Sequence, residues 1–200
     1  MEALVEAAAR VFCEDALTDY RRALDKAARQ LGLAARDVRV NPVDIEAAVI
    51  CYQRLFGGEA YAARLADLRQ TALDAMDLLA DFEPHLVGAA VSGAITDSHR
   101  VQLHAFADKP ESVDLLLEAR RIPFAVSERH YRYADGRDVE VPVLSFGDDA
   151  RGVDVAVFPE RERRRAPLSA VTGVAAKRLT REDVAVLAGS ASPRFKAAAA

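Results

Sequence analysis

The sequence predicts an α+β protein in which an N-terminal helical module precedes a small mixed sheet. Before Pro84, apolar residues recur every three or four positions, which is the period of a helix that buries one face. After Pro84 several segments alternate apolar and polar residues instead, as half-buried strands do. A helical half followed by a half rich in strands is typical of the α+β class. We expect a helical module over residues 1–83 and an α+β domain over residues 84–200, the alternative being one compact unit.

Composition limits the location and the partners of the protein. The length of 200 residues suits one domain or a domain with a helical extension, and the formal charge of −4 argues against a general nucleic-acid binder. No apolar run reaches the ~18 residues that span a bilayer. Glu2 and Glu6 stand where a signal peptide would carry basic residues, so we expect a cytoplasmic protein without a membrane partner. Cys13 and Cys51 lack the spacing of a metal-binding or redox pair and are interpreted as free thiols.

Helix boundaries in the first half are marked by capping residues. Gly32 follows a helical run as a C-terminal cap does. Asn41 and Pro42 form a start signal, in which a capping side chain precedes proline at the first helical position. Gly57 closes that helix, and the next helix ends before Pro84. The apolar stripe of this last helix consists of Leu65, Leu68, Ala72, Ala75, Leu79 and Phe82.

The second half combines strands with two helices. Asp108 and Glu111 have the spacing of a capping box, which predicts a helix from Asp108 to Arg121. Thr180 caps a last short helix. Short turns that contain glycine join the last three strands, which favours antiparallel neighbours. The expected strands are a short one near Leu86, then Val101–Ala107, Phe124–Tyr133, Val139–Phe146 and Val153–Phe158.

The segment Leu86–Asp108 has a distinctive layout: a short strand, a turn with two glycines, a polar run and a second strand. This layout resembles the core of the nucleotidyltransferase fold, the DNA polymerase β-like superfamily. In that fold a Gly-Ser turn holds a triphosphate, an Asp-x-Asp pair opening the next strand holds two magnesium ions, and a later strand supplies a third carboxylate. The whole chain also resembles an uncharacterised group of bacterial nucleotidyltransferase-like proteins, through Phe12–Asp15, Tyr20–Gly32, Tyr52–Phe56 and Gly88–Phe106.

The chain departs from the superfamily pattern at the metal ligands. Aligned on the glycines, the serine position falls on Ala89, the Asp-x-Asp positions fall on Arg100 and Gln102, and the third carboxylate falls on Asp154. The bacterial group often has His-Ser-Asp-Ile where this chain has Ser98–Val101. A guanidinium cannot ligate magnesium, which requires oxygen ligands. The resemblance therefore implies a catalytically degenerate protein, and we expect no catalytic residue, no metal and no cofactor.

The residues of the former binding cleft form the candidate ligand site. Gly88 and Gly93 either let the backbone approach a phosphate or permit a tight strand exit and close packing. Asp154 lies on the opposite strand face from its apolar neighbours, so it is either solvated or paired with Arg100. In such a pair, Arg100 would neutralise the carboxylate that faces magnesium in the superfamily. The full candidate set is Gly88, Ala89, Gly93, Arg100, Gln102 and Asp154.

The expected function is binding without catalysis. The ligand would be a nucleotide or another phosphate-bearing small molecule in the cleft, or a protein partner on the N-terminal helices. One alternative is an active, metal-dependent nucleotidyltransferase that uses Asp97, Asp154 and a further acidic residue that the sequence does not identify. The other is a purely structural or regulatory interaction protein. Nucleic acid is not an expected partner, because the net charge is negative.

Overall fold

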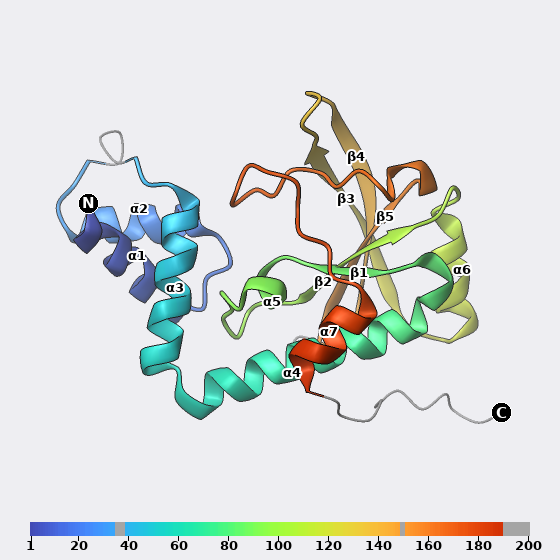
Figure 1. The fold of residues 1–200 in the computed structure, drawn as a ribbon, viewed down its shortest axis with the longest axis horizontal. Coiled ribbons are helices and arrows are strands. Elements are labelled where there is room, and N and C mark those ends of the chain that lie inside the picture. Colours follow the sequence, from blue (N-terminus) through green and yellow to red (C-terminus); the bar gives the residue numbers. More distant parts are fainter. Residues whose placement is uncertain (35–38, 149–150, 190–200) are drawn as a thin grey trace. The chain divides into compact units, whose positions relative to one another are not determined.

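The computed structural model describes residues 1–34, 39–148 and 151–189 and has the predicted α+β class (Figure 1). The chain forms two compact units. Unit 1 comprises Met1–Leu65, Ser92–His99 and Ala170–Thr172, and unit 2 comprises Ala66–Val91, Arg100–Ser169 and Gly173–Ala200.

This division differs from the predicted boundary between residues 83 and 84. Residues 66–83 belong to the same unit as the strands, and residues 92–99 belong with the N-terminal helices. Helical periodicity identifies a helix, but it carries no information about which neighbours bury the apolar face. The boundary is therefore not accessible from the pattern.

Three helices build most of unit 1. Asp19 caps α2 by accepting hydrogen bonds from two backbone N–H groups. Asn41 accepts from the N–H of Val43 at the start of α3, and Pro42 occupies the first turn, as predicted. Gly32 follows α2 with a φ of 70°, the left-handed conformation that the predicted cap requires. The helices are α1 (Glu2–Glu14), α2 (Tyr20–Gln30) and α3 (Pro42–Phe56).

The core of unit 1 is rich in alanine, which allows close approach of the helices. Phe12 is fully buried and stacks on Tyr20, with ring centroids 4.8 Å apart. Ala94 brings the loop 92–99 into this core, and the Thr96 hydroxyl donates to the carbonyl of Leu17. The other buried members are Leu4, Ala7, Ala8, Ala9, Val11, Ala23, Leu24, Ala27, Ala28, Ile45 and Val49.

The long helix α4 (Gly58–Leu78) contributes its residues from Ala66 onward to unit 2. A 3₁₀ turn, η2 (Ala80–Phe82), completes the segment before Pro84, as predicted. No helix among the described residues is long and apolar enough to cross a membrane. The predicted stripe is buried at Leu68, Ala72, Ala75 and Leu79.

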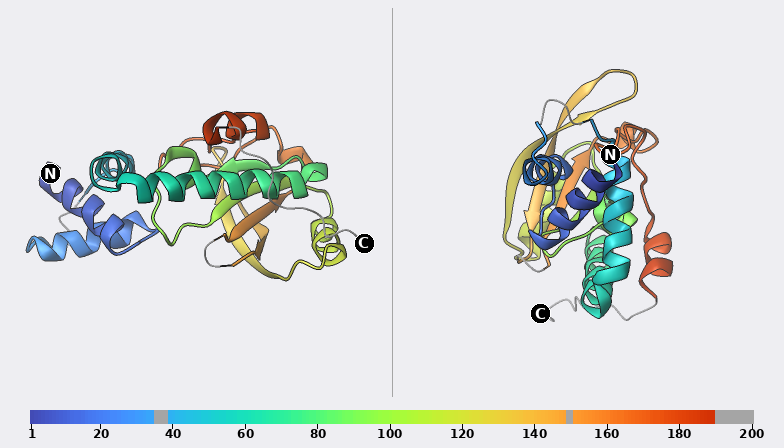
Figure 2. Two further views of the ribbon diagram at one scale, coloured as in Figure 1. Left: turned by 90° about the horizontal axis from the view of Figure 1, so that it is seen from below. Right: turned by 90° about the vertical axis from the view of Figure 1, so that its left-hand side faces the viewer.

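Unit 2 contains a five-stranded mixed sheet with the strand order β1-β2-β5-β4-β3. The pair β2 and β5 is parallel, whereas β3 with β4 and β4 with β5 are antiparallel, as predicted. Because β4 pairs with β5 only over residues 143–146, the β3–β4 hairpin runs past the ends of the other strands (Figure 2). The strands are β1 (His85–Val87), β2 (Val101–Phe106), β3 (Phe124–Arg132), β4 (Asp138–Phe146) and β5 (Val153–Phe158).

Two longer helices, a four-residue helix and a 3₁₀ turn complete the described fold. The capping box predicted for the first helix is wrong: the helix begins at Glu111 without a side-chain cap, and Asp108 instead accepts from a backbone N–H after β5. The cap predicted at Thr180 is present as a full capping box. These elements are α5 (Ala89–Ser92), α6 (Glu111–Ala119), η3 (Glu160–Glu162) and α7 (Arg181–Ala188).

Each unit holds one buried histidine whose pKa is lowered. In unit 1, Nδ1 of His99 accepts from the N–H of Thr96 at 2.9 Å, and burial lowers its pKa to about 4. In unit 2, Nδ1 of His104 accepts from Nε of Arg178 at 3.2 Å, and burial together with that guanidinium lowers its pKa to about 3. Both rings are therefore neutral in the folded protein at pH 7.

We expect the free energy of unfolding to fall as the pH decreases from 6.5 to 5. In this range the unfolded chain takes up a proton at each of the two histidines, while the folded protein does not, so acid favours the unfolded chain. Each histidine should contribute about 2 kcal/mol of this loss. Urea unfolding at a series of pH values measures it. His104→Gln should remove its share of the slope, and an unchanged slope would contradict the assignment.

Candidate functional site

The register of the sheet aligns three polar side chains at one end of unit 2. Gln102, Asp154 and Ser145 occupy directly opposed positions on β2, β5 and β4, so they share one face of the sheet. We call these three residues the polar row. It lies near the N-terminal ends of the parallel pair, which begin directly after Arg100 and Gly152. Further along the same face is an apolar cluster formed by Phe106, Val141, Val143, Ala156 and Phe158.

Of the two alternatives for Asp154, the structure has the ion pair with Arg100. Nε of Arg100 donates to Oδ1 of Asp154 at 2.9 Å, and Nη2 donates to the carbonyl oxygens of Phe146 at 3.0 Å and Val153 at 3.4 Å. The Ser145 hydroxyl donates to the same Oδ1 at 2.9 Å. The side chains of Arg100 and Asp154 are 30% and 14% exposed. The alternative of a solvated Asp154 is therefore wrong.

Gly152 makes room for the guanidinium of Arg100. A Cβ placed on Gly152 would overlap Nη1 and Cζ of Arg100, well inside the separation that real Cβ atoms reach. The same glycine accepts the backbone N–H of Val101 through its carbonyl, which pairs the starts of β2 and β5. The absence of a side chain here is thus a requirement of the Arg100 position.

A second guanidinium faces the same carboxylate. Nη2 of Arg129, on β3, lies 3.8 Å from Oδ2 of Asp154, and its side chain is 44% exposed. Two guanidinium groups against one carboxylate leave a net positive charge beside the polar row. Such a surface attracts anions and repels divalent cations.

The remaining candidates, Gly88, Ala89 and Gly93, lie in or beside the short helix that follows β1. Gly88 follows β1 with a φ of 74°, and a Cβ there would overlap the carboxamide oxygen of Gln102. Ala89 opens the four-residue helix α5. Gly93 belongs to unit 1, where its carbonyl accepts from the Tyr61 hydroxyl at 2.9 Å. The other five of the six candidates lie in unit 2.

The carboxylates that the active alternative needs are not grouped in the described structure. Within residues 1–34, 39–148 and 151–189, no three His, Cys, Asp or Glu side chains are placed to hold a metal ion. Asp154 is the carboxylate of the polar row, and Asp97 is an exposed residue of the loop 92–99 in unit 1. A two-metal centre needs several oxygen ligands around ions about 4 Å apart.

Sequence reasoning missed three residues of this site: Ser145, Arg129 and Gly152. Ser145 carried a usable signal, because it is a polar residue between two apolar positions of a predicted strand. Arg129 and Gly152 carried none, since their roles depend on which strands become neighbours.

No family model, curated protein or solved structure matches the chain. Membership of a nucleotidyltransferase-like family thus stays an expectation from the resemblance.

We expect Arg100→Ala and Asp154→Ala each to lower the free energy of unfolding by about 2 kcal/mol, because each leaves a partly buried charge unpaired. The double variant should be less destabilised than the sum by at least about 1 kcal/mol. Chemical denaturation of the four proteins measures this coupling. The exposed pair Arg181 and Asp77 is the matched control, with a coupling below about 0.5 kcal/mol. Equal coupling in both cycles would contradict the structural role.

We expect Gly152→Ala to destabilise the protein by about 1–3 kcal/mol, because the added methyl group must displace the Arg100 guanidinium. In the Arg100→Ala background the same change should be nearly neutral, since the obstacle is gone. Unfolding of the single and double variants tests this. An equal cost in both backgrounds would show that Gly152 is constrained by something else.

Proposed function

We propose that this protein is a catalytically degenerate, nucleotidyltransferase-like protein of the cytoplasm that binds a phosphate-bearing small molecule, such as a nucleotide, without transferring it. The observation that carries the proposal is the ion pair of Arg100 with Asp154. In the resemblance, Arg100 and Gln102 stand at metal-ligand positions and Asp154 at the third. The Arg100 guanidinium, which is bonded to the remaining carboxylate, places a positive charge where the superfamily has a metal ion.

The positive charge beside the polar row supports an anionic ligand. Arg129 is 44% exposed, and its planar guanidinium suits bidentate contact with a phosphate. Gln102 adds a carboxamide, partly exposed, on the same row. Arg100 and Ser145 already donate hydrogen bonds to protein acceptors. They therefore contribute to the electrostatic potential of the site and not to direct contacts with the ligand. We therefore assign the main phosphate contact to Arg129.

The proposal predicts ATP binding that does not require a metal. Calorimetric titration with ATP in EDTA and in Mn²⁺ should show no gain of affinity from the metal, because no ion bridges the phosphates to the protein. Arg129→Gln should weaken ATP about fivefold, the loss of about 1 kcal/mol. Arg132→Gln is the matched control and should bind ATP like the wild type. Arg132 lies on the same strand, three residues after Arg129, and its side chain is therefore on the opposite face of the sheet.

Mn²⁺ alone should titrate without a stoichiometric site. A micromolar Mn²⁺ site that is lost in Asp154→Ala would contradict the proposal. So would nucleotidyl transfer to protein, RNA or a small acceptor that is lost in the same variant, and the active alternative would then replace it. If neither the wild type nor Arg129→Gln bound ATP, the purely structural alternative would be favoured.

A further inference from the structure

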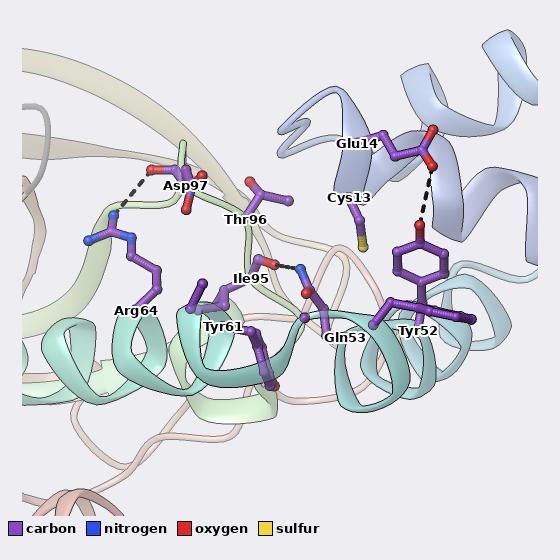
Figure 3. Close-up of a pocket in the computed structure, with 12 residues that line it drawn as sticks. Cys13, Glu14, Tyr52, Gln53, Tyr61, Arg64, Ile95, Thr96 and Asp97 are labelled. Atoms are coloured by element: carbon purple, nitrogen blue, oxygen red, sulfur yellow. Dashed lines mark hydrogen bonds between the residues drawn. The ribbon is translucent and has the colours of Figure 1, made fainter.

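Unit 1 contains a pocket of about 250 Å³, separate from the polar row (Figure 3). It lies among the end of α1, the end of α3, the start of α4 and the loop 92–99. Glu14 and Asp97 stand on opposite sides of it, and the Cys13 thiol points into the space between them (Figure 3).

Several hydrogen-bond donors around the pocket already bond to protein acceptors. The Tyr52 hydroxyl donates to Oε1 of Glu14 at 3.2 Å, and Nε2 of Gln53 donates to the carbonyl of Ile95 at 2.9 Å. Nη2 of Arg64 donates to the carbonyls of Asp97 at 3.2 Å and His99 at 2.8 Å.

Acceptors remain available there. Within the described part of the chain, no hydrogen bond is recorded to Oε2 of Glu14 or to the carboxylate oxygens of Asp97. Burial and the neighbouring Glu14 raise the pKa of the Cys13 thiol to about 11, so it carries no charge at pH 7. The lining thus sets two carboxylates against the single guanidinium of Arg64. A ligand that fits must bring donors and positive charge.

The apolar stripe of α3 continues beyond the core to the rim of this pocket. Ile45 and Val49 are 1% and 0% exposed, yet Leu55 and Phe56 in the last turn are 70% and 71% exposed. Phe56 packs against the Tyr52 ring with centroids 4.8 Å apart and lines the pocket. Two large apolar side chains in water beside an acceptor-rich pocket indicate a surface wider than a small molecule covers.

We propose that this pocket receives the ammonium or guanidinium group of a lysine or arginine from a partner protein, whose neighbouring apolar residue covers Leu55 and Phe56. Glu14, held by Tyr52, accepts from the cation, and the Tyr52 and Phe56 rings pack against the side-chain stem. Asp97 adds a second carboxylate on the other side. The acceptor-rich lining selects a positively charged residue of the partner. The exposed last turn of α3 selects an apolar residue next to it.

The test uses capped dipeptides as probes, titrated into the full chain and followed by NMR. N-acetyl-phenylalanyl-lysine amide should bind about fivefold more tightly than the norleucine peptide, which lacks the ammonium group, and the glutamate peptide should bind more weakly still. Equal binding of the lysine and norleucine peptides would overturn the proposal. Tighter binding of free phenethylammonium than of the lysine peptide would overturn the assignment to a protein partner.

Variants of the lining locate the binding. Glu14→Gln and Phe56→Ala should each weaken the lysine peptide three- to fivefold, and Glu14→Gln should leave the norleucine peptide unchanged. Glu6→Gln is the matched control, an exposed carboxylate two turns earlier on α1 and outside the pocket, and it should bind like the wild type. Loss of lysine selectivity in Glu6→Gln, or its retention in Glu14→Gln, would contradict the proposal.

Discussion

The charge balance at Asp154 determines the structure of one end of the sheet. A carboxylate that is only 14% exposed needs compensation, and Arg100 provides it with a direct hydrogen bond. The same guanidinium bonds to the carbonyl of Phe146 at the end of β4. It also requires the empty position at Gly152, where β5 begins. One side chain therefore links the start of β2, the start of β5 and the end of β4.

This arrangement also decides which chemistry the site supports. A metal-dependent transferase concentrates carboxylates where the ions bind, because several oxygens must surround each ion. Here the opposed positions of the polar row hold a carboxamide, one carboxylate and a hydroxyl, and two guanidinium groups surround that carboxylate. Anions are favoured there and divalent cations are not, which is the basis of our proposal of binding without catalysis.

Local signals in the sequence predicted the helices and strands better than they predicted which of these elements become neighbours. Strand β5 was predicted with its observed bounds, Val153–Phe158, and the caps at Asn41 and Thr180 are present, since each depends on a few adjacent residues. The Asp108 cap failed because a backbone N–H distant in sequence competes for its carboxylate. Strand register, which the sequence does not encode locally, brought Ser145, Arg129 and Gly152 into the site. The pocket of unit 1 likewise could not be predicted from the sequence, because three helix ends and a loop that are distant in the sequence form it.

A crystal structure with ATP and Mn²⁺, examined by anomalous diffraction, tests the central claim most directly. We predict that Nε of Arg100 stays bonded to Asp154, that no manganese peak lies within coordination distance of that carboxylate, and that the phosphates lie beside Arg129. A manganese ion on Asp154, with Arg100 displaced from it, would contradict the account.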